Sequence, residues 1–101
     1  MAVQSSVLGF AGDACITATP SAGTSTSEIT LGNDAIFAIN ADQDVMIRFG
    51  NPGMGAATAT NYRIPANQQT VFYTSTANTS IRVFNNGSST ANIFIQKLSR
   101  Y

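Results

Sequence analysis

The stretch TSIRVFNNGSSTANIFIQKL, residues 79–98, decides the fold. Both of its arms are rich in β-branched and aromatic residues, as a half-buried strand requires. Every second position carries an apolar β-branched residue, namely Ile81 and Val83 in the first arm and Ile93 and Ile95 in the second. Asn86 and Gly87 lie between the arms, and glycine permits the positive φ of a tight turn. The pattern predicts two strands joined as a β-hairpin, with a turn no longer than residues 85–89.

Similar alternation recurs along the rest of the chain. It predicts further strands at residues 14–19, 28–31, 35–40, 44–49, 58–64 and 69–73. Residues 35–40 and 44–49 form a second predicted hairpin, because only a short polar connector separates them. No segment has apolar residues at helical spacing over ten or more positions. The sequence therefore predicts an all-β fold: an antiparallel β-sandwich, or a small jelly-roll-like barrel, of about eight short strands.

The chain length of 101 residues predicts a single β-sandwich domain spanning residues 1–101. Residues 1–12 form either a short strand or an N-terminal arm within it. An apolar arm of this kind either tucks into the core or lies on a neighbouring molecule, and the sequence leaves both arrangements open. The N-terminus has no basic region followed by a long apolar one, so we expect no signal peptide. No apolar run is long enough to span a membrane.

Charged residues are unusually scarce. They make up 10% of the chain, which contains a single lysine, whereas soluble domains usually have roughly 25%. Either neutral polar side chains keep such a surface soluble, or much of the surface is covered in an assembly. All acidic residues precede position 45 and all basic residues follow it. This segregation either pairs early strands with late ones or sets one copy against the next. The few scattered bases do not predict a nucleic-acid-binding surface.

The residues needed for common catalytic and metal sites are missing. The chain has no histidine and one cysteine, which excludes the usual zinc sites and histidine-dependent triads. Cys15 has apolar neighbours and is predicted to be a buried structural thiol. Asp42 and Asp44 flank a predicted hairpin loop, which favours a solvated turn over an acid–base pair. Gly50, Gly53 and Gly55 do not match a dinucleotide-binding motif. We therefore expect no catalytic residue, no cofactor and no metal, and hence no enzyme.

Partner contacts are a more promising interpretation of the polar and apolar residues outside the predicted core. The candidate contacts are Val3, Val7 and Leu8 in the N-terminal arm, Arg48 and Arg63 on strands, and Asn51 and Met54 at the glycine-rich tip of residues 50–57. Arg48 has the parity opposite to Val45 and Ile47, so it faces solvent or a partner. Most aromatic residues are predicted to lie in the core. A sugar site would instead need an exposed aromatic beside an amide, as Tyr73 with Asn78 or Tyr62 with Asn61 would provide.

Residues 44–98, just over half the chain, resemble small structural proteins of tailed bacteriophage virions. The resemblance is carried by VMIRFG at 45–50, ATAT at 57–60, YRIPA at 62–66, VFY at 71–73 and SIRVF at 80–84. It implies a β-sandwich protein of the head-decoration or cement type, or a neck or fibre-base component, with no catalytic residues. It also implies location in the virion, after assembly in the host cytoplasm.

The partners that the resemblance implies are the major capsid protein or another virion protein, and further copies of the chain itself. A trimer is favoured because three-fold sites are common docking points in capsids. Neither nucleic acid nor membrane is an expected partner. The alternative function is a glycan- or receptor-binding module of a phage fibre, neck or adhesin.

Overall fold

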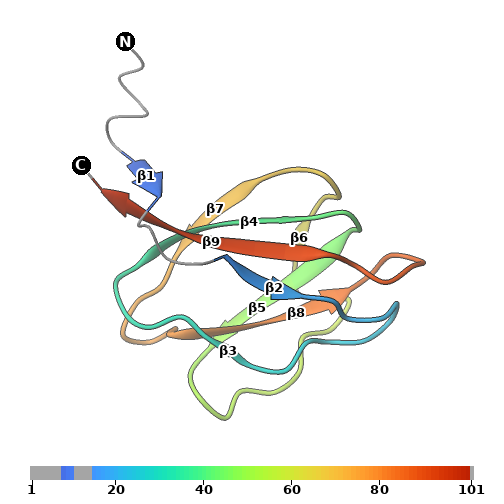
Figure 1. Ribbon diagram of the computed structural model, residues 1–101. Coiled ribbons are helices and arrows are strands. Elements are labelled where there is room, and N and C mark those ends of the chain that lie inside the picture. Colours follow the sequence, from blue (N-terminus) through green and yellow to red (C-terminus); the bar gives the residue numbers. More distant parts are fainter. Residues whose placement is uncertain (1–7, 11–14, 101) are drawn as a thin grey trace.

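The computed structural model describes residues 8–10 and 15–100, and the described residues form strands and loops without a helix. Nine strands lie in this part of the chain (Figure 1). They are β1 (Leu8–Phe10), β2 (Ile16–Ala18), β3 (Ile29–Thr30), β4 (Ile36–Ala41), β5 (Val45–Gly50), β6 (Tyr62–Ile64), β7 (Thr70–Tyr73), β8 (Ser80–Asn85) and β9 (Ile93–Arg100). The predicted all-β fold class is confirmed.

The strands form two antiparallel sheets that face each other. Sheet A has the order β9–β4–β7, with β1 and β2 both paired to the outer side of β9, and sheet B has the order β3–β8–β5–β6. From β2 to β9 the chain crosses between the sheets at every connection except that from β5 to β6. This alternation is the strand order of a jelly roll. Strands β6 and β7 are therefore the two sheet edges on one side of the sandwich.

Both predicted hairpins are wrong, although their four strands exist. Strands β8 and β9 lie in different sheets, and so do β4 and β5. Each short polar connector is therefore an arch that crosses from one sheet to the other. Alternation identifies a strand and its buried face, but the partner strand depends on contacts that are distant in sequence. A short loop rich in Asn, Gly and Ser is compatible with either connection.

The side chain of Asn85 explains why the chain turns into an arch after β8. Asn85 is fully buried, and its Nδ2 donates to the carbonyl oxygens of Pro20 at 3.0 Å and Ser89 at 2.7 Å. Its Oδ1 accepts a hydrogen bond from the Gly87 backbone N–H at 2.9 Å. A buried carboxamide needs such partners, since an unpaired one is costly. Asn85 thus fixes the loop over the end of the sandwich.

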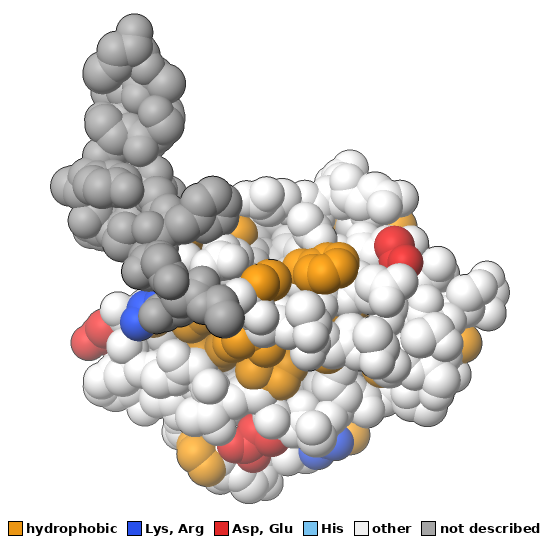
Figure 2. All heavy atoms as spheres, viewed as in Figure 1, with side chains coloured by type: hydrophobic (Ala, Val, Ile, Leu, Met, Phe, Trp, Pro, Cys, Tyr) orange, Lys and Arg blue, Asp and Glu red, His pale blue; other side chains and the backbone are white. Residues whose placement is uncertain are grey.

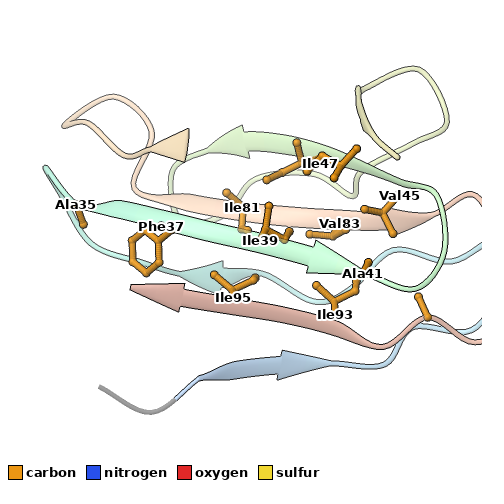
Figure 3. Packing of buried hydrophobic residues seen from close by; sticks show 12 residues of the cluster. Ala35, Phe37, Ile39, Ala41, Val45, Ile47, Ile81, Val83, Ile93 and Ile95 are labelled. Carbon is orange, nitrogen blue, oxygen red and sulfur yellow. The ribbon is translucent and has the colours of Figure 1, made fainter. Parts of the chain in front are cut away.

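The core between the sheets is mainly aliphatic (Figure 3). Its largest fully buried apolar side chains are Ile39, Ile47, Ile64, Ile81, Ile93, Ile95, Val45 and Val83. Among the aromatic residues whose side chains are described, only Phe37 is buried. The predicted aromatic core is therefore wrong: Phe84 is only partly buried, and Phe94 is 48% exposed. Strand parity accounts for this, because the neighbours Val83, Ile93 and Ile95 take the inward positions.

Two other expectations are also corrected. Cys15 is exposed rather than buried, because it lies just before β2 at the edge of sheet A. The strand predicted at residues 58–64 is shortened to β6, because its first half forms a turn. In that turn the Thr58 backbone N–H donates to Asn61 Oδ1 at 2.7 Å, and the Asn61 N–H donates to the Thr58 carbonyl at 3.2 Å. Asparagine commonly stabilises turns in this way.

Candidate interaction surfaces

The outer face of sheet B is occupied by the chain's own loops. Arg48 of β5 and Arg82 of β8 are register partners on this face. Arg82 Nε donates to the Thr26 carbonyl at 2.9 Å, and Arg48 Nη1 donates to the Ala56 carbonyl at 3.0 Å. The repulsion between two adjacent guanidinium groups is thereby offset by two backbone acceptors. The arginines anchor the loops before β3 and after β5 to the sheet.

The predicted contacts Asn51 and Met54 belong to the second of these loops. Asn51 Oδ1 accepts hydrogen bonds from the backbone N–H of Thr79 at 3.3 Å and from its hydroxyl at 3.2 Å. The Met54 N–H donates to the Asn51 carbonyl at 3.0 Å, which closes a turn. Glu28 Oε1 accepts from the Gly53 N–H at 2.8 Å and so links the two loops. Arg48, Asn51 and Met54 therefore have structural partners within the chain, and partner contacts by them stay a prediction.

The remaining predicted contacts do not join this cluster. Arg63 of β6 forms a salt bridge with Asp44, with Nη2 and Oδ2 2.8 Å apart. Leu8 lies in β1, whose backbone pairs with the end of β9 in the same chain, where Leu8 is opposite Arg100. Val3 and Val7 lie outside the described residues. The structure thus does not gather the predicted contact residues into one surface.

Asp42 and Asp44 accept hydrogen bonds from different residues. Asp42 accepts hydrogen bonds from the backbone N–H and from Nδ2 of Asn92, each at 2.8 Å. Asp44 accepts from Arg63 and, through Oδ1, from the Ala66 N–H at 2.9 Å. The Asn92 backbone bond lowers the pKa of Asp42, and the Arg63 hydrogen bond lowers the pKa of Asp44. Both groups are carboxylates at neutral pH, which disfavours a general-acid role for either.

The side of the sandwich between β6 and β7 carries the main exposed apolar surface. The described chain has four large exposed hydrophobic side chains, and Tyr62, Val71 and Tyr73 on β6 and β7 are three of them. The exposed fractions of Tyr62 and Tyr73 are 65% and 71%. We call these three residues, with the hollow of about 200 Å³ between the two strands, the open side.

Aromatic side chains form the floor of the open side. The rings of Phe37 and Phe72 stack with centroids 5.8 Å apart, and Phe49 meets Phe72 edge-on at 5.6 Å. Phe49 and Phe72 both line the hollow. Strands β6 and β7 each pair on one side only within the described residues, with β5 and β4 respectively. The open side therefore combines exposed rings with two unpaired strand edges.

The fourth exposed hydrophobic side chain is Phe94 on the outer face of sheet A. Sequence reasoning missed it because aromatic residues are usually buried in strands, but its parity, opposite to that of Ile93 and Ile95, was an available signal. The tyrosines named for a sugar site are indeed exposed. The Asn61 carboxamide has another role, since it holds the turn before β6, and Asn78 closes a tight turn with Ser75 through its backbone.

The described residues contain no group of three or more His, Cys, Asp or Glu side chains placed to hold a metal ion. They also include no helix that is long and apolar enough to cross a membrane.

No protein-family model matches the chain, and no curated protein does. Two solved structures share its architecture. A de novo designed double-stranded β-helix, solved by solution NMR, has 15% identity and a TM-score of 0.62, over 84% of this chain and 99% of its own. A protein from the Bacillus endospore appendages, which form disulfide-linked pili, has 16% identity and a TM-score of 0.51, over 84% of this chain and 80% of its own. At these identities the likeness concerns the fold alone.

Proposed function

We propose that the protein is a non-enzymatic structural subunit, and that copies of it associate through the open side. The observation that carries this proposal is the concentration of exposed Tyr62, Val71 and Tyr73 on two adjacent strand edges. Large exposed apolar patches mark interaction sites, and tyrosine is enriched in protein interfaces. Unpaired strand edges add backbone donors and acceptors that a neighbour can satisfy.

A second copy of the same chain suits this surface because the surface carries no net charge. The residues that line its hollow are uncharged, and the nearby Arg63 on β6 is neutralised by Asp44. Two such surfaces can meet without repulsion between like charges and without burying an unpaired ion, which would be costly. A closed ring of copies would cover the exposed rings on every subunit. The expected assembly is a trimer.

The finer form of the proposal is a virion protein that binds a capsid shell, as a decoration or cement protein does. Its support is the resemblance of residues 44–98 to phage structural proteins and the scarcity of surface charge. The fold is also compatible with assembly, because a protein of the same architecture belongs to pilus-forming appendages. This chain would assemble differently from disulfide-linked pili. Its 101 residues contain one cysteine, so disulfides could join copies only in pairs.

Sedimentation velocity of wild-type and variant proteins tests the association. The double variant Tyr62→Ser/Tyr73→Ser should be monomeric at concentrations where the wild type is oligomeric. The matched control is Phe94→Ser, which removes an exposed aromatic ring away from the open side and should leave the oligomer intact. A wild type that stays monomeric, or a double variant that sediments like the wild type, would refute the proposal. Co-sedimentation with purified capsids then tests shell binding separately.

A further inference from the structure

Phe94 occupies an unusual position for an exposed aromatic residue. It lies near the centre of the outer face of sheet A, where its register partners are Thr17 of β2 and Asn40 of β4. Both partners have short polar side chains and are themselves exposed. The ring therefore stands on the sheet with little beside it. Figure 2, viewed from the side of β2 and β9, shows orange side chains over β9 among mostly white ones.

Two open hollows flank the Phe94 ring. The larger is about 420 Å³ and is lined by Asn40, Ala41, Asp42, Asn67, Asn92 and Phe94. The smaller is about 160 Å³ and is lined by Ala38, Ile39, Asn40, Gln69, Phe94 and Gln96. Phe94 and Asn40 belong to both hollows, so the two form one continuous surface. The larger hollow falls within the size range of small-molecule sites.

Carboxamide groups dominate the polar lining. Five of them surround the ring, from Asn40, Asn67, Gln69, Asn92 and Gln96. Within the described part of the chain, the side chains of Asn40, Asn67 and Gln69 have no hydrogen-bond partner. Each carboxamide can donate two hydrogen bonds and accept others. Asn40, Asn67 and Gln69 can therefore meet a ligand that both donates and accepts hydrogen bonds.

The backbone around the larger hollow is held in place by contacts at one end of the sandwich. Asn92 is fixed by its two hydrogen bonds to Asp42. Asn67 has a positive φ of 61°, which asparagine tolerates, and its N–H donates to the Ala41 carbonyl at 2.7 Å. These bonds connect the β4–β5 arch to the β6–β7 turn and to the β8–β9 arch. The larger hollow is thus largely preformed.

The chemistry of this surface selects among ligand classes. Neither hollow is lined by lysine or arginine, which disfavours phosphates and nucleic acids, since these need cations along the backbone. The lone carboxylate, Asp42, is already bound by Asn92, which disfavours cationic ligands. A neutral sugar fits best. Its apolar C–H face can stack on an aromatic ring while its hydroxyls exchange hydrogen bonds with carboxamides.

We propose that Phe94 and the surrounding carboxamides form a binding subsite for one residue of a neutral glycan. Phe94 supplies the stacking platform, and Asn40, which faces both hollows, contacts hydroxyls on either side of the ring. The larger hollow shares no lining residue with the open side, whereas the smaller hollow lies beside it, because Ala38 is the register partner of Val71.

Amide chemical-shift perturbation of the full chain with maltotriose, cellotriose and tri-N-acetylchitotriose tests the subsite. At least one of these neutral sugars should shift the amides around Phe94. Phe94→Ala should weaken that binding about tenfold or more, and Phe94→Trp should retain it because the flat ring is kept. Asn40→Ala should also weaken binding, without moving the thermal midpoint, because the Asn40 side chain is exposed.

The matched control is Tyr73→Ser, which removes an exposed ring on the open side and should bind sugar like the wild type. Sialyllactose, a charged sugar, should bind no better than the neutral probes. Three results would each overturn the proposal: no shifts near Phe94 with any neutral probe, equal loss of binding in Tyr73→Ser, or unchanged binding in Phe94→Ala. Because the readout is sugar binding, it is independent of the oligomeric state.

Discussion

Asp42 and Asn92 join the two arches at one end of the sandwich. The Asp42 carboxylate accepts two hydrogen bonds of 2.8 Å from Asn92, and the Asp42 N–H donates to the Asn92 carbonyl at 3.3 Å. The two residues lie 50 positions apart in sequence. This contact ties the β4–β5 connection to the β8–β9 connection, and so joins two chain crossings that a hairpin interpretation would have kept separate.

This contact predicts a dependence of stability on acid. Hydrogen bonds from Asn92 lower the pKa of Asp42 in the folded state. The contribution to stability is therefore present above the unfolded-state pKa of about 3.9 and is lost as the pH falls through the lower folded-state value. Asp42→Asn should lower the midpoint of urea unfolding at neutral pH. The difference from the wild type should shrink in strong acid, and a difference that is constant with pH would contradict this assignment.

Asn85 should be far more important to stability than its neighbour in the loop. Asn85→Ala removes a buried carboxamide and leaves the Pro20 and Ser89 carbonyls without their donor. We expect a loss of about 2–3 kcal/mol in the free energy of unfolding, measured by urea denaturation. The matched control, Asn86→Ala, changes an exposed side chain and should alter stability by less than about 0.5 kcal/mol. Equal effects of the two substitutions would refute the role of Asn85.

Alternation along β9 predicts unequal losses of stability for two adjacent substitutions. Ile95 is fully buried between the sheets, so Ile95→Ala should cost about 2–5 kcal/mol. Phe94→Ala removes a larger side chain, but that side chain is half exposed, so its cost should be clearly smaller. Thermal or chemical denaturation of both variants measures the difference. A larger loss for Phe94→Ala than for Ile95→Ala would place the ring in the core and reverse the assignment of the two faces.

The proposed association should depend little on ionic strength. Tyr62, Val71 and Tyr73 are uncharged, so burying them forms no ion pair that salt could screen. Sedimentation of the wild type at low and high sodium chloride should give similar oligomer populations. Dissociation at high salt would indicate that the segregated acidic and basic residues hold the copies together instead.

Sequence patterns were sufficient for most of the strands. Period-two alternation put Ile81 and Val83 on one face and Ile93 and Ile95 on one face, without showing which faces are buried, and it gave Arg48 an outward position. The pairing of strands could not be predicted in the same way. Whether the loop after Asn85 forms a hairpin or an arch depends on Pro20, which is 65 residues away in sequence.

The surfaces were harder to predict than the strands. Tyr62 and Tyr73 were recognised as possible exposed aromatics. The sequence around them, however, does not show that β6 and β7 are adjacent sheet edges. Phe94 was assigned to the core by its residue type, although its parity opposes that of Ile93. The carboxamides around it come from separate strands and loops, and only the jelly-roll topology brings them together.

The most direct test of the central claim, association through the open side, is a distance measurement between copies. Val71→Cys in a Cys15→Ser background places one spin label on the open side, and Ser88→Cys in the same background places one on the exposed β8–β9 loop. Double electron–electron resonance on the oligomer should give a short distance between copies for the label at position 71, and a longer one for the label at position 88. A shorter distance at position 88 than at position 71 would contradict the claim.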